Sequence, residues 1–202
     1  MIVRHPDLCV VVQAGGESRR MGQDKALALF RGQPLVQRVL ERLAPLAGEL
    51  VVTTNRPADF AFLGVRLAGD IYPGYGALGG LHTALSAASL PVVAVAACDM
   101  PFASAALLDA AVQTMIETGC DAVVPRSENG LEPFHAVYRQ ETCLPLVEVA
   151  IRAEKRRVDA WFAQARMHFI PFESVLQHDP SGRAFLNVNT PEELADAENI
   201  EE

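Results

Sequence analysis

The sequence has little of what marks membrane-embedded and secreted proteins. No apolar run approaches the roughly 18 residues needed to cross a bilayer, so a membrane-spanning protein is not expected. Residues 1–7 have no small-residue cleavage site, which argues against a signal peptide. The four cysteines, Cys9, Cys98, Cys120 and Cys143, form no close pair and fit neither a zinc site nor a disulfide framework. These absences predict a cytoplasmic protein.

Positive charge is also scarce. The 202 residues include 17 Lys and Arg against 25 Asp and Glu, a net charge of −8, which argues against a protein that coats nucleic acid. An anionic small-molecule substrate stays compatible, because positive charge can be concentrated in one loop. Hydrophobic residues make up 50% of the chain and charged residues 21%, as in ordinary globular proteins, and the length suits one domain over residues 1–202.

Stretches with strand-like and helix-like patterns alternate along the chain. Predicted strands cover residues 8–13, 50–54, 65–68, 91–97, 122–125, 134–138 and 167–172, and predicted helices cover 34–43, 78–88, 104–118, two stretches within 140–166, and a last helix from Thr190. This alternation predicts an α/β fold, a three-layer Rossmann-like sandwich with a mainly parallel sheet and helices on both faces. Ligands in such folds bind beyond the carboxyl ends of the strands. Function should therefore be sought in the loops after Gln13, Thr54, Ala68 and Ala97.

The first of these loops combines glycines with cations. It reads AGGESRRMGQDK and ends at Lys25. The adjacent Gly15 and Gly16 allow a sharp turn that points backbone N–H groups into one concavity, and Arg19, Arg20 and Lys25 add positive charge. This combination indicates a polyphosphate site. A Walker A loop is excluded, because the lysine does not follow a glycine at the required spacing.

The loop resembles the signature L-A-G-G-x-S-x-R-M-G-x-D-K of nucleotidyltransferases that activate sugars and cofactors, in particular the molybdenum cofactor guanylyltransferase family. Gln13 stands where leucine is usual. The C-D-M-P-F segment at 98–102 and the N-x-N-T-P-E-E-L segment at 187–194 are also similar to that family. In the loop at 76–80 alanine and glycine replace the proline and alanine of the family's G-P-L-A-G. The resemblance thus extends over almost the whole chain.

The resemblance implies transfer of GMP from GTP to the phosphate of molybdopterin, with or without molybdenum, and release of pyrophosphate. Cytidylyl transfer to the same cofactor is the alternative, and formation of a sugar nucleotide is the next. The expected metal is Mg²⁺, with Mn²⁺ as a substitute. The expected partners are GTP, molybdopterin and transient cofactor-delivery proteins or molybdoenzymes, with no nucleic acid and no membrane.

Two residues carry the expected chemistry. Asp99 follows a buried strand, and Mg²⁺ in nucleotide sites is held by one or two carboxylates plus phosphate oxygens, so Asp99 is the predicted metal ligand. Capping of the helix near Ser104 is a competing role for Asp99, although Ser104 is five positions further on and Pro101 lies between the two residues. Lys25 is predicted to be catalytic, because a positioned cation offsets the repulsion between the acceptor phosphate and the α-phosphate. No general base is needed, since the acceptor phosphate is already ionised.

The remaining site residues follow from the resemblance. It implies nucleotide binding by Gln13, Ala14, Gly15, Gly16, Arg20, Lys25, Asn55, Asp70 and Asp99, and acceptor binding by Asn187 and Asn189. Asn55 and Asp70 are also ordinary turn residues, and the segment around Asn189 is also a helix-start signal with Thr190 as its cap.

The remaining notable polar residues are predicted to have structural roles. His82 and His135 lie in segments that resemble functional ones, but a histidine on a helix face or one that packs on a strand is the favoured interpretation of each. A solvated helix face is the default reading of the basic cluster Arg152, Lys155, Arg156 and Arg157, and a site for the acceptor's phosphate is its alternative.

Two rival functions come from other classes. Residues 74–79 spell G-x-G-x-x-G, with Asp99 downstream, as in a dinucleotide-binding oxidoreductase. However, the preceding predicted strand holds Arg66, Pro73 intervenes before the first glycine, and the better phosphate loop follows Gln13. The other rival is a nucleotide-binding regulatory module without turnover, which is disfavoured because Lys25 and Asp99 are both present.

Overall fold

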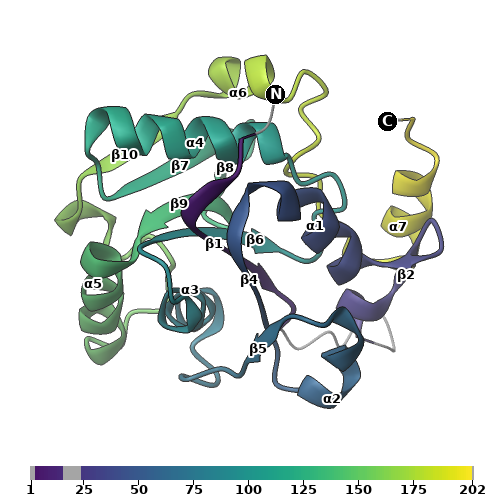
Figure 1. The fold of residues 1–202 in the computed structure, drawn as a ribbon, viewed down its shortest axis with the longest axis horizontal. Helices are drawn as coiled ribbons and strands as arrows, with labels where there is room; N and C mark the ends of the chain where they lie inside the picture. Colours follow the sequence, from purple (N-terminus) through teal and green to yellow (C-terminus); the bar gives the residue numbers. More distant parts are fainter. Residues whose placement is uncertain (1–2, 16–23, 202) are drawn as a thin grey trace.

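The computed structural model describes residues 3–15 and 24–201, and its main feature is one mixed sheet (Figure 1). The order of strands is β10-β7-β9-β6-β1-β4-β5, with β8 added beside β7. The strands are β1 His5–Gln13, β4 Ala47–Thr53, β5 Arg66–Ala68, β6 Val92–Ala97, β7 Ala122–Ser127, β8 Gly130–Leu131, β9 His135–Arg139 and β10 Met167–Ile170. A separate antiparallel pair joins β2 Leu29–Phe30 to β3 Gln33–Pro34. The helices are α1 Leu35–Leu43, α2 Pro57–Phe60, α3 Gly76–Ala87, α4 Ala105–Thr118, α5 Gln140–Arg152, α6 Phe172–His178 and α7 Pro191–Glu198.

Four of the six neighbouring pairs along this seven-strand order are parallel, and the register of the parallel strands brings four loops together. Strand β1 runs parallel to β4 and β6, and β4 runs parallel to β5. Gln13 pairs with Thr53 on one side and with Ala97 on the other, and Thr53 pairs with Ala68. The four strands therefore end at one level. The predicted mainly parallel α/β sandwich is confirmed, with β9 antiparallel to both β6 and β7 and the short β8 antiparallel to β7.

Helices cover both faces of the sheet because its central strands are apolar on both sides. In β1, Leu8, Val10 and Val12 point into the core beneath α1 and α4, whereas Cys9 and Val11 point into the core beneath α3 and α5. All five side chains are fully buried. Burying an aliphatic side chain completely contributes about 1.5–3 kcal/mol, so β1 is held firmly along the axis that leads to the loop after Gln13.

Helix ends follow the predicted capping chemistry at two places. The Ser104 hydroxyl accepts a hydrogen bond from Leu107 N at the start of α4, and Gly119 ends that helix in the left-handed region. Thr190 caps α7 in the same way through Glu193 N. Ser104, and not Asp99, is therefore the cap of α4.

Two sequence predictions of local structure need correction, and one hairpin was missed. The second helical stretch expected before residue 166 is reduced to a 3-10 turn, Phe162–Gln164, after Glu154 adopts a positive φ of 56° beyond α5. The strand expected over 167–172 ends at Ile170, because Pro171 initiates the unpredicted helix α6. The β2–β3 hairpin was also not predicted, and its turn depends on Arg31 and Gly32 with φ of 50° and 78°.

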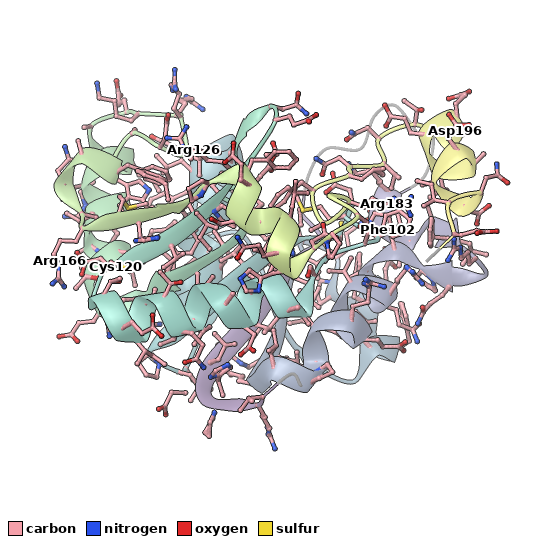
Figure 2. All side chains as sticks on the ribbon, turned by 90° about the horizontal axis from the view of Figure 1, so that it is seen from above. Phe102, Cys120, Arg126, Arg166, Arg183 and Asp196 are labelled. Atoms are coloured by element: carbon pink, nitrogen blue, oxygen red, sulfur yellow. The ribbon has the colours of Figure 1, made fainter. Side chains whose placement is uncertain are left out.

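After Arg166 the C-terminal segment crosses from one end of the molecule to the other. Figure 2 shows Cys120 and Arg166 at one end of the molecule and Phe102, Arg183 and Asp196 at the other. The last helix, α7, lies beside the β2–β3 hairpin in Figure 1. None of the helices in the described part of the chain is both long and apolar enough to cross a membrane.

Candidate active site

The loop after β1 leads directly into the candidate site. Ala14 N donates to Thr53 O over 2.9 Å, which continues the β1–β4 ladder past the last paired residue. A Cβ added at Gly15 would lie 3.7 Å from Asp70 Oδ1, so the backbone at Gly15 runs close to the loop after β5. Gly16 and Arg20, both predicted to bind nucleotide, lie outside the described residues.

Lys25 lies at the centre of the site. It begins a 3-10 turn, Lys25–Leu27, that Asp24 caps by accepting a hydrogen bond from Ala26 N. Lys25 Nζ donates to Asp99 Oδ2 over 2.5 Å and to Asn189 Oδ1 over 2.8 Å. An ammonium group has three N–H donors, and the residues that the structure describes accept two of them, which leaves one for a ligand. Three predicted site residues from three distant parts of the sequence thus meet at one cation.

Asp99 is held by its backbone and keeps one carboxylate oxygen for a ligand. Cys98 N donates to Gln13 O over 3.0 Å, and Asp99 O accepts from Val188 N over 2.9 Å. Asp99 Oδ1 is buried and has no hydrogen-bond partner among the residues that the structure describes. A buried acceptor without a partner is costly, which makes Oδ1 a ready ligand for a cation or a donor. The neighbouring Cys98 is not a nucleophile, because burial and the Asp99 charge raise the pKa of its thiol to about 12.

A small apolar cluster places Lys25, Asp99 and Asn189 side by side. It consists of Ala28, Phe30, Leu35, Phe102, Val188 and Ala197. The rings of Phe30 and Phe102 meet edge to face at 5.7 Å between centroids. Each site residue is a few positions from a member of this cluster in the sequence. The cluster therefore joins the segment after Lys25, the loop of Asp99 and the C-terminal segment before Asn189.

Helix α1 braces the Asp99 loop from below. Arg38 Nε donates to Pro101 O and Arg42 Nε to Ala103 O, both over 2.9 Å. The guanidinium of Arg38 also lies 4.7 Å from the centre of the Phe30 ring. Burial lowers the pKa of both guanidinium groups from its ordinary value.

Asn55 and Asp70 form the other edge of the site. Asn55 Nδ2 donates to Asp70 Oδ2, and Asp70 N donates to Asn55 Oδ1, each over 2.8 Å. These bonds join the loops that follow β4 and β5. Asn55 is exposed and Asp70 is half-buried, so both can be reached by a ligand.

The two C-terminal asparagines differ in their surroundings. Asn189 contacts Lys25, whereas the Asn187 side chain donates to Phe185 O over 3.2 Å. Asn189 N donates to Glu193 Oε2, so the segment is also the start of α7, as its alternative reading proposed. The backbone N–H of Asn189 thus takes part in the start of α7, whereas its side chain accepts the hydrogen bond from Lys25.

Sequence reasoning did not single out Arg56, which follows Asn55 at the end of β4. Its guanidinium forms an ion pair with Asp24, the residue that caps the turn of Lys25. The available signal was an arginine next to Asn55 in a loop already expected to face the site.

The two histidines lie in the interior. His82 is 3% exposed and meets the Tyr72 ring edge to face at 4.8 Å. His135 is fully buried, its Nε2 accepts from Ser104 N over 2.9 Å, and burial lowers its pKa to about 4. Both arrangements match packing roles.

Most of the basic cluster at 152–157 has local partners. Arg152 pairs with Glu148 and Arg157 pairs with Asp159, both at the surface. Arg156 donates to Gly74 O over 2.6 Å and lies 4.8 Å from the Tyr75 ring centre. It therefore braces the G-x-G-x-x-G segment, whose later glycines belong to α3.

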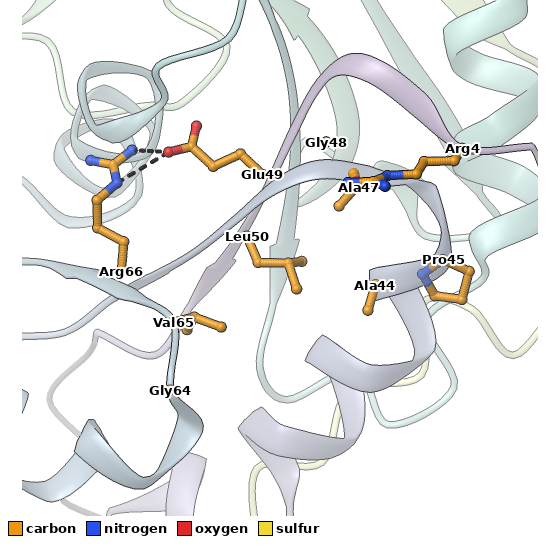
Figure 3. A pocket seen from close by; sticks show the side chains of 10 residues that line it. All are labelled: Arg4, Ala44, Pro45, Ala47, Gly48, Glu49, Leu50, Gly64, Val65 and Arg66. Atoms are coloured by element: carbon orange, nitrogen blue, oxygen red, sulfur yellow. Dashed lines mark hydrogen bonds and ion pairs between the residues drawn. The ribbon is translucent and has the colours of Figure 1, made fainter.

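A separate cavity lies at the amino ends of the strands, opposite the candidate site (Figure 3). Its volume is about 580 Å³, and its lining includes Arg4 just before β1, Glu49 near the beginning of β4 and Arg66 at the beginning of β5. The carboxyl ends of the strands, where Lys25 and Asp99 lie, are on the other side. This cavity is not part of the candidate site.

Comparison with known proteins places the chain in a family. The model of the MobA-like NTP transferase domain matches residues 10–168. The chain belongs to this family. It is 35% identical over 189 residues to a probable molybdenum cofactor guanylyltransferase of Pelotomaculum thermopropionicum, with 93% of this chain and 90% of that protein covered. It is 37% identical over 198 residues to one of Chloroflexus aggregans, with 94% and 93% covered.

Solved structures agree with this assignment. The molybdopterin-guanine dinucleotide biosynthesis protein A of Archaeoglobus fulgidus is 28% identical, with a TM-score of 0.80 over 94% of this chain and 96% of that one. The 4-diphosphocytidyl-2C-methyl-D-erythritolsynthase of Anaerococcus prevotii shares the fold alone, at 11% identity and a TM-score of 0.66 over 95% and 94% of the chains. The resemblance stated from the motifs is confirmed, and the chain is a nucleotidyltransferase.

Proposed function

We propose that this nucleotidyltransferase transfers GMP from GTP to the terminal phosphate of molybdopterin and releases pyrophosphate. The observation that carries the proposal is the position of Lys25 Nζ, which bonds Asp99 on the nucleotide side and Asn189 on the C-terminal side. Guanylyl transfer is preferred over cytidylyl transfer because the relatives at 33–37% identity are named molybdenum cofactor guanylyltransferases.

Lys25 supplies the positive charge at the reacting phosphate. An oxygen of the acceptor phosphate attacks the α-phosphorus of GTP, the bond from that phosphorus to the bridging oxygen breaks, and pyrophosphate leaves with the electron pair. The remaining N–H of Lys25 donates to the α-phosphate, where negative charge gathers in the transition state. The chain needs no base, because the attacking phosphate is already ionised.

Two groups of residues orient the substrates. Asn55 and Asp70 bind the nucleoside of GTP. The backbone from Gln13 to Gly15, together with Gly16 and Arg20, belongs to the same proposed nucleotide site. Asn187 and Asn189 bind the acceptor. Because Asn189 also bonds Lys25, a bound acceptor is placed next to the cation that lies at the α-phosphate.

The residues present suit a magnesium ion bound with the nucleotide. Asp99 Oδ1 is a buried carboxylate oxygen with no hydrogen-bond partner in the described part of the chain, and one carboxylate plus phosphate oxygens is a usual Mg²⁺ environment. The described residues contain no group of three or more His, Cys, Asp and Glu that could hold a metal ion by themselves, so phosphate and water would supply the remaining ligands. When bound, Mg²⁺, or Mn²⁺ in its place, would neutralise charge on the phosphates.

We also place the reaction in the cytoplasm. All four cysteines are unpaired and buried, which suits a reducing compartment.

A binding screen followed by a transfer assay tests the proposal. Thermal shifts are measured with each of the four ribonucleoside triphosphates, with and without Mg²⁺. A ligand at a hundredfold excess over its Kd stabilises the native state by about 2.7 kcal/mol, which is readily detected. We expect a magnesium-dependent shift with GTP, and molybdopterin guanine dinucleotide as the product when molybdopterin is added. Product from CTP alone would support the cytidylyl alternative, and no product from either triphosphate would contradict the proposal.

A further inference from the structure

We infer that Arg56 is a positioning residue for nucleotidyl transfer, acting through Asp24 on Lys25. The inference rests on the proposed function for its kinetic part, and on the described contacts for its structural part. It assigns a role to a cation outside the predicted set of site residues.

Arg56 is held at the edge of the site by both its backbone and its side chain. Its N–H donates to Thr54 Oγ1 over 3.2 Å, directly after β4. Its guanidinium pairs with Asp24 and also lies 3.6 Å from Asp59 Oδ2. The side chain of Arg56 is 53% exposed, whereas that of Asp24 is only 12% exposed. The pair therefore joins a solvent-facing cation to a carboxylate that is largely withdrawn from water.

Asp24 uses both carboxylate oxygens, and each has a consequence for Lys25. Oδ1 accepts from Ala26 N over 2.9 Å and caps the turn that begins at Lys25. The other oxygen pairs with Arg56. The backbone carbonyl of Asp24 accepts from Leu27 N over 3.0 Å. The orientation of Asp24 therefore sets the start of the turn and the direction in which the Lys25 side chain leaves it.

Removing the guanidinium leaves a poorly hydrated carboxylate without its counter-charge. A largely buried anion without a partner is unfavourable, so Asp24 would turn toward water or toward the adjacent Lys25 ammonium. Either movement weakens the cap at Ala26 N, and a loosened turn holds Lys25 less well against Asp99. Arg56 also connects the two halves of the site, because it follows Asn55, which pairs with Asp70.

The test measures the turn itself as well as turnover. The variants are Arg56→Ala, Arg56→Lys and the control Arg66→Ala. Arg66 is also an arginine at an end of the same pair of strands and bonds Glu49 over 2.6 Å, but it lies beside the cavity at the amino ends of the strands (Figure 3). Backbone hydrogen exchange is followed at Ala26 and Leu27, and kcat and KM are measured with GTP and molybdopterin.

We expect Arg56→Ala to speed exchange at Ala26 and Leu27 and to lower kcat, each by about tenfold, with KM for GTP changed less than about threefold. Arg56→Lys should recover part of both losses, because a single charge neutralises Asp24 without the forked geometry of arginine. Arg66→Ala should leave the exchange at these two residues and kcat unchanged.

Each other result overturns the inference or separates it from the proposed function. Unchanged exchange in Arg56→Ala means that Asp24 does not depend on Arg56. Faster exchange with unchanged kcat means that the turn does not position Lys25 for the reaction. A rise in KM for GTP with unchanged kcat means that Arg56 contacts the nucleotide directly. If the wild-type protein transfers no GMP, the proposed function fails, and the exchange rates still decide whether Arg56 holds the turn.

Discussion

Lys25 and Asp99 are 74 positions apart in the sequence, yet Lys25 Nζ lies 2.5 Å from Asp99 Oδ2. The side chains of both residues are 17% exposed, so the pair is neither a solvated surface contact nor sealed from a ligand. A partly buried cation and carboxylate at the carboxyl ends of parallel strands can act together on a bound triphosphate. The contact leads to one prediction for Lys25 and a different one for Asp99.

Removing the Lys25 ammonium should slow turnover more than it weakens binding. We expect Lys25→Ala to lower kcat by about two orders of magnitude, which corresponds to ~3 kcal/mol of transition-state stabilisation. The loss falls on kcat because the charge on the transferring phosphate develops in the transition state. Steady-state rates of pyrophosphate release measure it. A kcat equal to that of the wild type would rule out a catalytic role for Lys25.

The Asp99 carboxylate should be needed for the response to metal. Asp99→Asn keeps the shape of the side chain and an oxygen for Lys25, but it removes the negative charge that suits Mg²⁺. We expect turnover that no longer rises with Mg²⁺ concentration. Asp109→Asn is the matched control, because Asp109 is a partly exposed carboxylate on α4 whose partner is His5, at 2.6 Å. Normal magnesium dependence in Asp99→Asn would show that the ion is held elsewhere.

The ends of the strands that border the site were predictable from the sequence, because they follow from local patterns. The apolar run at 8–13, the asparagine after residue 54 and the aspartate after Gly69 each mark where a strand ends. Parallel pairing then brings these ends to one edge, as the register of Gln13 with Thr53 and Ala97 confirms. Hydrophobic periodicity and the rule that ligands bind at that edge are therefore enough to locate these residues.

The contacts of the C-terminal segment were not predictable in the same way. Asn189 reaches Lys25 across 164 positions through the packing of Val188 with Phe30 and Phe102, and no local pattern encodes that packing. The pairing of Arg56 with Asp24 likewise depends on side-chain directions in two loops. Sequence similarity could suggest that Asn189 belongs to the site, but not that its side chain bonds the predicted catalytic lysine.

Asn189 should affect the acceptor more than the nucleotide. We expect Asn189→Ala to raise KM for molybdopterin and to lower kcat, since the side chain both faces the proposed acceptor site and fixes Lys25. KM for GTP should change little. The control is Asn199→Ala, because Asn199 ends the same helix and donates only to Ala195 O over 3.0 Å among its described side-chain contacts. If Asn189→Ala instead raised KM for GTP alone, the acceptor role would be wrong.

His135 should make the protein less stable in mild acid. Burial lowers its pKa to about 4 in the folded state, against an ordinary value near 6.5. Between these two values the unfolded chain binds a proton that the folded chain excludes, so stability is fully present above about pH 6.5 and is lost as the pH falls toward 4. Between pH 7 and pH 5 this histidine alone should lower the free energy of unfolding by about 2 kcal/mol.

Urea unfolding at pH 7 and pH 5 measures this loss, and the variant His135→Gln isolates it. Glutamine can accept the hydrogen bond from Ser104 N but does not titrate, so the difference between the two pH values should shrink by about 2 kcal/mol relative to the wild type. His178→Gln, a change of an exposed histidine on α6, should keep the wild-type difference. Because the comparison is between two pH values for each variant, a general loss of stability in His135→Gln does not affect it. An undiminished difference in that variant would mean that His135 is already protonated in the folded protein at pH 5, and that its bond from Ser104 N is broken there.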